Sequence, residues 1–323
     1  MITLLLFALL ALIFVSAALA PLESLGWWAW SGKKPPRPEQ LERIATQQSI
    51  PEPAKDFYLV YLSGIGAISG ASIPKEEYPF IHALEDRLVN GEVISDIYPY
   101  SVTNTGLTVQ PIFAGVWRRI ERMRRKNPDS APAMVVNLHN AFQLFVSADR
   151  RYGPIYNLGV ANEITRGLIR HGYRPGTGKP VVLLGWSGGG QIAIGAATYL
   201  AAMIGDVYVI SVGGMLSDDI GLDKVKHLWH LHGSKDRLQA LGQKLYVGRW
   251  PVKPQSPWNR ALRAGRIELI QLGPINHNGK GNYFDLATEL PDQSCTYGEK
   301  TLSTIEQVLA EASLLKASHR QLS

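Results

Sequence analysis

One segment constrains the fold more than any other: an apolar, strand-like run that ends in a glycine-rich turn and continues at once as an apolar helix pattern. It reads Pro180-Val-Val-Leu-Leu-Gly-Trp-Ser-Gly-Gly-Gly-Gln191 and contains Gly185-x-Ser187-x-Gly189. A serine on so sharp a strand-to-helix turn has strained backbone angles, and the two glycines let neighbouring backbone pass without a Cβ collision. The turn exposes the hydroxyl, and the helix amino terminus favours negative charge developing beside it. Ser187 is therefore the candidate nucleophile.

Short apolar runs alternate with helix-length segments from Asp56 onward. This alternation predicts an α/β fold in which a mostly parallel central sheet carries crossover helices on both faces. The segment 191–204 is too short to span a bilayer and is predicted to be a buried crossover helix. Residues 107–156 exceed what a crossover needs, which predicts an inserted helical cap with helices near 115–126 and 135–146. The expected strands are 57–62, 93–98, 181–185, 207–212, 227–232 and 267–272.

Two later strands end in loops that carry the other groups a serine nucleophile requires. One run, His227-Leu-Trp-His-Leu-His232, leads into Gly233-Ser-Lys-Asp236, and another, Ile267-Glu-Leu-Ile-Gln-Leu272, leads into Gly273-Pro-Ile-Asn-His277. With the Gly-x-Ser-x-Gly turn before them, these loops resemble the α/β-hydrolase superfamily over roughly residues 56–315. The resemblance implies a hydrolase in which His277 takes the serine proton and Asp236 orients the imidazole. Asp218 and Asp219 are rival acids, and His232 is expected to be a structural hydrogen-bonding residue.

The resemblance also implies an oxyanion hole. One donor would be the backbone N–H of Gly188, and the second would be that of Ile65, in the loop Ser63-Gly64-Ile65-Gly66 after the first strand. Many members of the superfamily have histidine where this chain has Ser63. This departure concerns how the loop is anchored and leaves the backbone donor itself unaffected.

The amino terminus predicts attachment to a membrane. Residues Ile2 to Leu22 are apolar except for Thr3 and Ser16, and the stretch has the length of a bilayer-spanning helix. We expect a membrane anchor over 1–30, a proline-rich linker over 31–54 and the hydrolase domain over 55–323. The aromatic residues Trp27, Trp28 and Trp30, followed by Lys33, Lys34 and Arg37, favour a single-pass protein with a cytoplasmic domain. A cleaved signal at Ala18-Leu-Ala20 is the alternative, although Pro21 follows it.

The net charge of +6 is unevenly distributed, because the segment 115–126 holds six basic residues and one acidic residue. Its apolar residues recur at helical spacing, so we expect a basic amphipathic helix that packs on the core or contacts anionic lipid. No nucleic-acid motif accompanies it, and nucleic acid is not an expected partner. The single cysteine, Cys295, excludes an intramolecular disulfide and a structural zinc site, and no cofactor or metal is expected.

Together these features predict a serine hydrolase that cleaves a small-molecule or lipid ester through an acyl-enzyme, at a membrane surface. Esterase, lipase, thioesterase and amidase activities share these residues, so the sequence does not separate them, and the oligomeric state stays open. One alternative is an inactive binding protein on the same fold. Another is a dinucleotide-binding protein built on Gly64-Ile-Gly66-Ala-Ile-Ser-Gly70, with Glu85 or Asp86 at the ribose, although Pro74 and Pro79 interrupt the helix it needs.

Overall fold

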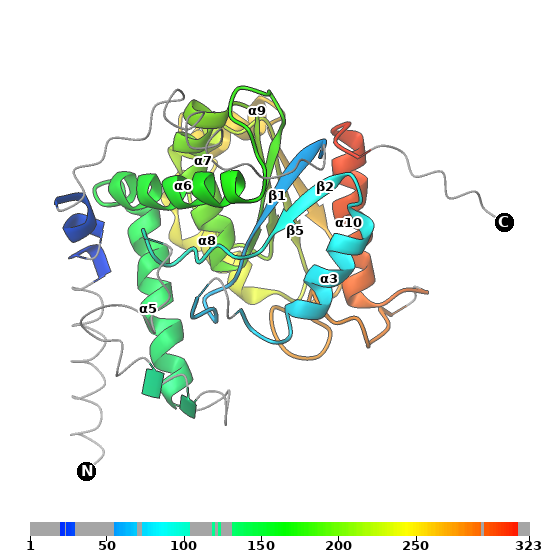
Figure 1. Ribbon diagram of the computed structural model, residues 1–323. Coiled ribbons are helices and arrows are strands. Elements are labelled where there is room, and N and C mark those ends of the chain that lie inside the picture. The colour runs from blue at the N-terminus through cyan, green and yellow to red at the C-terminus, as the bar shows by residue number, and fades with distance from the viewer. Residues whose placement is uncertain are drawn as a thin grey trace, which may run out of the picture.

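Six aliphatic runs form one parallel sheet (Figure 1). The computed structural model describes residues 20–22, 24–29, 55–69, 73–103, 118–119, 122–123, 131–291 and 294–315. Within them the strand order is β2-β1-β3-β4-β5-β6, and every neighbouring pair is parallel. This confirms the predicted α/β class with a parallel central sheet. The strands are β1 (Phe57–Leu62), β2 (Gly91–Ile94), β3 (Val181–Trp186), β4 (Val207–Val212), β5 (Leu228–His232) and β6 (Ile267–Gln271).

The strand order reverses between β1 and β3, which positions the candidate site. The chain first adds β2 on one side of β1 and then crosses to place β3 on the other side. Leu62 at the end of β1 is in register with Gly185 near the end of β3. The loops that leave these two strands therefore start side by side at the carboxyl edge of the sheet, where open α/β sheets place their ligands.

Both faces of the sheet are buried under helices. Tyr58, Val60 and Leu62 of β1 belong to one hydrophobic cluster, whereas Phe57, Leu59 and Tyr61 belong to a second, as the alternation of a strand requires. In Figure 1, α3 and α10 lie on one side of the sheet, and α6 and α7 lie on the other. The helices are α3 (Tyr78–Arg87), α5 (Ala131–Ala148), α6 (Gly153–Arg170), α7 (Gly188–Ile204), α8 (Arg237–Leu245), α9 (Pro257–Arg263) and α10 (Tyr297–Glu311).

Element boundaries depart from the prediction mainly at β2. It spans Gly91–Ile94, whereas the sequence pattern predicts 93–98, because the apolar residues after Ile94 leave the sheet edge and enter the core. The helix expected over 135–146 is found as α5, and it packs against α6 and α7. Most of the first expected cap helix lies outside the described residues, so the cap insertion over 107–156 stays a prediction.

The predicted membrane elements fall largely outside the described residues. This holds for residues 1–19 of the anchor, for the linker, and for most of the basic segment 115–126. No helix in the described portion is long and apolar enough to cross a bilayer. Residues 24–29 are helical, and Trp27 packs against the core cluster, whereas Trp28 is exposed. Arg118, Arg119 and Arg122 are also exposed.

A buried histidine on β5 makes stability depend on pH. The side chain of His230 is buried, its Nδ1 lies 3.2 Å from Ser211 Oγ, and burial lowers its pKa to about 3. An unfolded histidine titrates near pH 6.5, so the unfolded chain binds a proton that the folded chain excludes, and stability falls as pH decreases below that value. We expect His230→Gln to lose about 2 kcal/mol less stability than the wild type between pH 7 and pH 5, measured by urea unfolding. The exposed His82→Gln should match the wild type, and an equal pH slope in His230→Gln would contradict the prediction.

Candidate active site

Ser187 occupies the turn between β3 and α7. Its backbone has φ 51° and ψ −116°, a conformation that residues other than glycine seldom adopt. Its flanking glycines are required by close backbone contacts. A Cβ at Gly185 would lie 2.5 Å from the Gly190 Cα, and one at Gly189 would lie 2.1 Å from the Leu62 carbonyl oxygen. The spacing of the motif therefore follows from three backbone segments that meet at this turn.

The structure brings the three residues of the expected triad into one hydrogen-bonded chain. Ser187 Oγ lies 2.9 Å from His277 Nε2, and His277 Nδ1 lies 2.8 Å from Asp236 Oδ2. Because an ionised carboxylate only accepts hydrogen bonds, Nδ1 carries the proton toward Asp236 and Nε2 is left to accept from the serine hydroxyl. This is the arrangement that a general base needs.

Asp236 is held as a carboxylate by its surroundings. Its Oδ1 accepts from the backbone N–H groups of Leu238 and Gln239, which caps α8, and its Oδ2 accepts from His277 and from the Tyr283 hydroxyl at 2.8 Å. Burial alone would raise the pKa of Asp236, but these hydrogen bonds and the charge of His277 outweigh it and lower the pKa below its usual value. A buried anion beside the imidazole is the group that stabilises an imidazolium.

The rival residues have other roles. Asp218 forms an ion pair with Arg150 at 2.9 Å, and Asp219 accepts from the Gly221 N–H at the start of a short 3₁₀ helix, Ile220–Asp223. Burial raises the pKa of Asp219 to about 6. The expectation that His232 is a hydrogen-bonding residue is not met, because its side chain makes no hydrogen bond within the described residues. Its ring lies beside that of His230, with ring centroids 5.8 Å apart, and burial lowers its pKa. No hydrogen bond within the described residues links any of these rivals to His277.

The two expected oxyanion donors are neighbours. A Cβ built on Gly188 would lie 2.9 Å from Ile65 Cγ2, and one built on Gly64 would lie 3.5 Å from Ser187 Cβ. The loop turns sharply here, because the Ala67 N–H donates to the Gly64 carbonyl oxygen at 3.1 Å. A dinucleotide site would need a helix directly after this turn, but α3 begins only at Tyr78, so the geometry that the dinucleotide alternative needs is not met.

Two further residues contact the triad and were not predicted from the sequence. Trp186 stacks on the imidazole with ring centroids 4.6 Å apart, and Tyr283 donates to Asp236 while its oxygen accepts from the Gly233 N–H at 2.7 Å. Trp186 lies inside the Gly-x-Ser-x-Gly pentapeptide, so its proximity to the base could have been inferred from the motif. Tyr283 lies in a loop without periodicity, and nothing in its sequence context identifies it.

The hydroxyl of Tyr283 gives a further prediction. We expect Tyr283→Phe to lower kcat about threefold to tenfold and to destabilise the fold by about 1–3 kcal/mol, because the buried Gly233 N–H loses its acceptor and Asp236 loses a donor. Ester turnover and urea unfolding would measure the two effects. Tyr297→Phe is the matched control, since that buried tyrosine has no hydroxyl partner within the described residues. Equal behaviour of the two variants would show that the Tyr283 hydroxyl is not needed.

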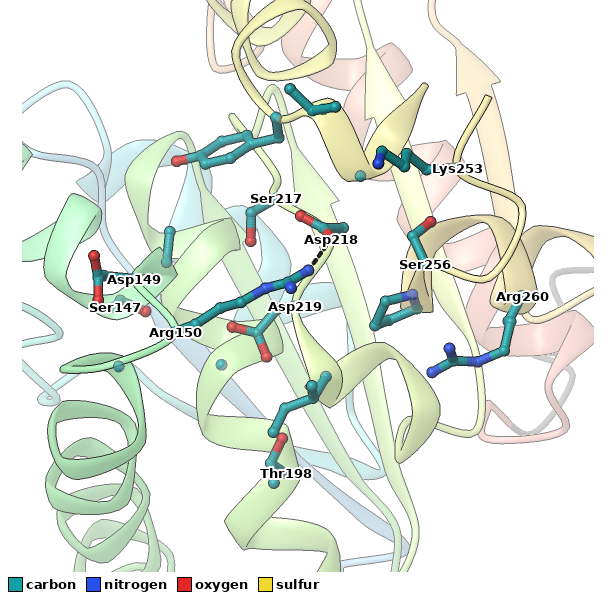
Figure 2. Close-up of a pocket in the computed structure, with 18 of the residues that line it drawn as sticks. Ser147, Asp149, Arg150, Thr198, Ser217, Asp218, Asp219, Lys253, Ser256 and Arg260 are labelled. Carbon is teal, nitrogen blue, oxygen red and sulfur yellow. Dashed lines mark hydrogen bonds and ion pairs between the residues drawn. The ribbon is translucent and has the colours of Figure 1, made fainter. Parts of the chain in front are cut away.

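A separate cavity of about 1010 Å³ lies beside α7, and no residue of the triad lines it (Figure 2). Its walls come from the turn between α5 and α6, from the loop after β4 and from the segment between α8 and α9. Arg150 reaches across it to Asp218 as an exposed ion pair, an interaction that typically contributes less than about 1 kcal/mol. In the described parts of the chain no cluster of His, Cys, Asp or Glu could hold a metal ion.

The fold and the site together define a class of protein. A parallel sheet in this order, with a serine at the strand-to-helix turn and an aspartate and a histidine on two later loops, fits the α/β-hydrolase fold. No protein-family model matches the sequence, and no curated protein matches it. Among solved structures the chain is similar to a dienelactone hydrolase-like promiscuous phosphotriesterase from metagenomic libraries. That match has 9% identity and a TM-score of 0.44, and it covers 80% of this chain and 88% of the other. A likeness this distant carries no information about the substrate.

Proposed function

We propose that this protein is a serine hydrolase that cleaves an acyl ester through an acyl-enzyme intermediate. The observation that carries the proposal is the unbroken hydrogen-bonded chain from Ser187 Oγ through His277 to Asp236. A serine hydroxyl is barely nucleophilic unless a base accepts its proton, and an imidazole aligned by a buried carboxylate is such a base. An inactive binding protein would have no need for this alignment.

Each step follows from these contacts. His277 Nε2 takes the proton as Ser187 Oγ bonds to the ester carbonyl carbon, and the carbonyl oxygen becomes an oxyanion beside the N–H groups of Gly188 and Ile65. The imidazolium then protonates the leaving alcohol, and the carbon–oxygen bond to that alcohol breaks. A water molecule, deprotonated by His277 in the same way, releases the acid and restores the serine.

The groups packed against Gly188 are mostly apolar, which supports an apolar acyl group. A Cβ on Gly188 would come within 3 Å of Ile65 Cγ2, Leu144 Cδ1 and the Tyr100 hydroxyl, so two of the three nearest groups are aliphatic. The apolar segment 2–22 and the basic segment 115–126 add a reason to expect the substrate at a membrane. We therefore propose a lipid or small apolar ester as the substrate, and a membrane-tethered enzyme.

A fluorophosphonate probe tests the proposed chemistry directly. The full chain in detergent micelles is expected to become labelled, and labelling should disappear in Ser187→Ala and weaken strongly in His277→Ala. A series of 4-nitrophenyl esters from acetate to palmitate would then define the acyl length. A folded wild-type chain that resists labelling, both in micelles and on anionic vesicles, would instead favour the binding-protein alternative.

The membrane tether has its own test. The full chain should float with phosphatidylglycerol-containing vesicles in a density gradient, and a chain that lacks residues 1–30 should float less. If both behave alike at high salt, the amino-terminal segment is not the anchor. Protease digestion of the domain in sealed cells would contradict a cytoplasmic orientation.

A further inference from the structure

The oxyanion loop is held from two sides by buried polar side chains that take no part in the triad. On one side is Glu77, which is 2% exposed and immediately precedes α3. Its Oε2 accepts from Ser63 Oγ at 2.6 Å and from the Tyr61 hydroxyl at 2.8 Å. Glu77 is the N-cap residue of α3, but its side chain makes no cap hydrogen bond and reaches to the loop instead.

On the other side is Asn140 of α5. Its Nδ2 donates to the carbonyl oxygens of both Ile65 and Ala67, each at 2.7 Å, and its Oδ1 accepts from the Tyr98 hydroxyl at 2.9 Å. The side chain of Asn140 is buried and therefore has a single orientation in this network. Together Glu77 and Asn140 bond to both ends of the turn that contains Ile65.

These bonds determine where the Ile65 N–H points. The Gly64 carbonyl accepts from the Ala67 N–H, and in a planar trans peptide the next N–H points the opposite way. The preceding peptide is fixed as well, because the Ser63 carbonyl oxygen accepts from the Tyr100 hydroxyl at 3.0 Å. Within the described residues the Ile65 N–H has no acceptor. The carbonyl oxygens on both sides of the Ile65 N–H are thus bonded, and that N–H is left as a donor for the substrate.

We infer that Glu77 and Asn140 are positioning residues that pre-orient the Ile65 N–H as an oxyanion donor, with Ser63 as the link to Glu77. This inference rests on the proposed serine-hydrolase function. It also explains the departure at Ser63, since a serine hydroxyl bonded to a buried carboxyl group anchors this loop where many α/β-hydrolases have histidine. Pre-orientation matters because a donor that must first reorganise stabilises the transition state less.

The environment of Glu77 is consistent with a structural carboxyl group. Burial raises its pKa to about 8, and the hydrogen bonds from Ser63 and Tyr61 keep the pKa from rising further. Glu76 is its one charged neighbour among the causes of this shift. No hydrogen bond within the described residues joins Glu77 to Ser187 or His277, so it acts on the reaction through Ser63 and the loop backbone.

The test compares Ser63→Ala, Glu77→Gln and Asn140→Ala with the wild type, using the full chain in detergent. The substrate is 4-nitrophenyl acetate, and the inhibitor is an apolar trifluoromethyl ketone, which forms a charged hemiketal on the serine. The corresponding alcohol, which forms no hemiketal, reports ordinary binding. Ser147→Ala is the matched control, because Ser147 is equally buried and its hydroxyl donates to the Asn157 side chain at 2.7 Å, away from the loop.

We expect Ser63→Ala and Asn140→Ala to lower kcat about tenfold, which is less than the hundredfold or greater loss on removing a donor outright, with KM within twofold. Affinity for the ketone should fall by the same factor while affinity for the alcohol stays unchanged. Glu77→Gln combined with Ser63→Ala should cost little more than either change alone, because both act on one link.

The outcomes separate the two proposals. A wild-type chain that neither turns over ester nor reacts with a fluorophosphonate would overturn the proposed function. An active wild type whose loop variants keep kcat and ketone affinity within twofold would overturn only the positioning role. Parallel losses of ketone and alcohol affinity, with a lower Tm, would assign these residues to folding alone. Ser63→Ala decides the matter if the Glu77 variant does not fold, because it removes a single oxygen atom.

Discussion

Ser187→Ala is expected to abolish fluorophosphonate labelling and to lower the kcat for ester hydrolysis by about 10⁵- to 10⁶-fold. The nucleophile and its base act as a unit. Without the Ser187 hydroxyl, His277 has no nucleophile from which to accept a proton. Residual turnover should come only from water in the oxyanion site. Single-turnover kinetics with 4-nitrophenyl acetate would show the loss as a missing burst of nitrophenol.

Ser217→Ala is the control for this variant. Ser217 is also a buried serine after a parallel strand, but it follows β4 and lines the separate cavity. Turnover by the Ser217→Ala variant should stay within twofold of the wild type. Retained labelling in Ser187→Ala, with loss in Ser217→Ala, would place the nucleophile in the loop after β4 and contradict the assignment of Ser187.

Asp236→Asn is expected to lower kcat by about 10⁴-fold while leaving the fold intact. An asparagine at this position can offer its amide N–H to His277 Nδ1, which turns the imidazole into the tautomer whose Nε2 carries the proton and cannot accept from Ser187. The capping bonds to Leu238 and Gln239 survive, because an asparagine oxygen accepts them equally well. Circular dichroism should therefore match the wild type.

Asp219→Asn is the matched change at the rival acid. It keeps the bond from the Gly221 N–H and should leave kcat within twofold. A large loss in Asp219→Asn and a small one in Asp236→Asn would exchange their roles. We expect the opposite result, because His277 is hydrogen-bonded to Asp236.

Much of the sheet could be predicted because its strands are buried on both faces. Such strands are continuous apolar runs, and five of the six, β1, β3, β4, β5 and β6, match the predicted ranges to within one residue at each end. The edge strand β2 was displaced, since its apolar run continues into residues that pack in the core without pairing. An apolar run indicates which residues are buried but not which of them pair in a sheet. Tyr98 is buried, yet it lies outside β2.

The triad could be predicted because its members follow strand ends in a fixed order along the chain. The residues that hold the triad and the oxyanion loop could not. Glu77, Asn140 and Tyr283 lie 14 to 75 positions in sequence from the residues they contact. Those contacts are to a serine hydroxyl, two backbone carbonyls and a carboxylate oxygen. Contacts of this kind depend on how helices dock, which leaves no local pattern.

The backbone of Ser187 bears on why the chain has a serine there at all. A residue other than glycine that is held at φ 51° and ψ −116° lowers the stability of the fold by about 1–3 kcal/mol. Glycine would adopt the same angles without that cost. Ser187→Gly is thus expected to stabilise the fold while it removes the hydroxyl. The hydroxyl at position 187 is therefore present at a cost in stability, which is the trade expected of a residue with a chemical role.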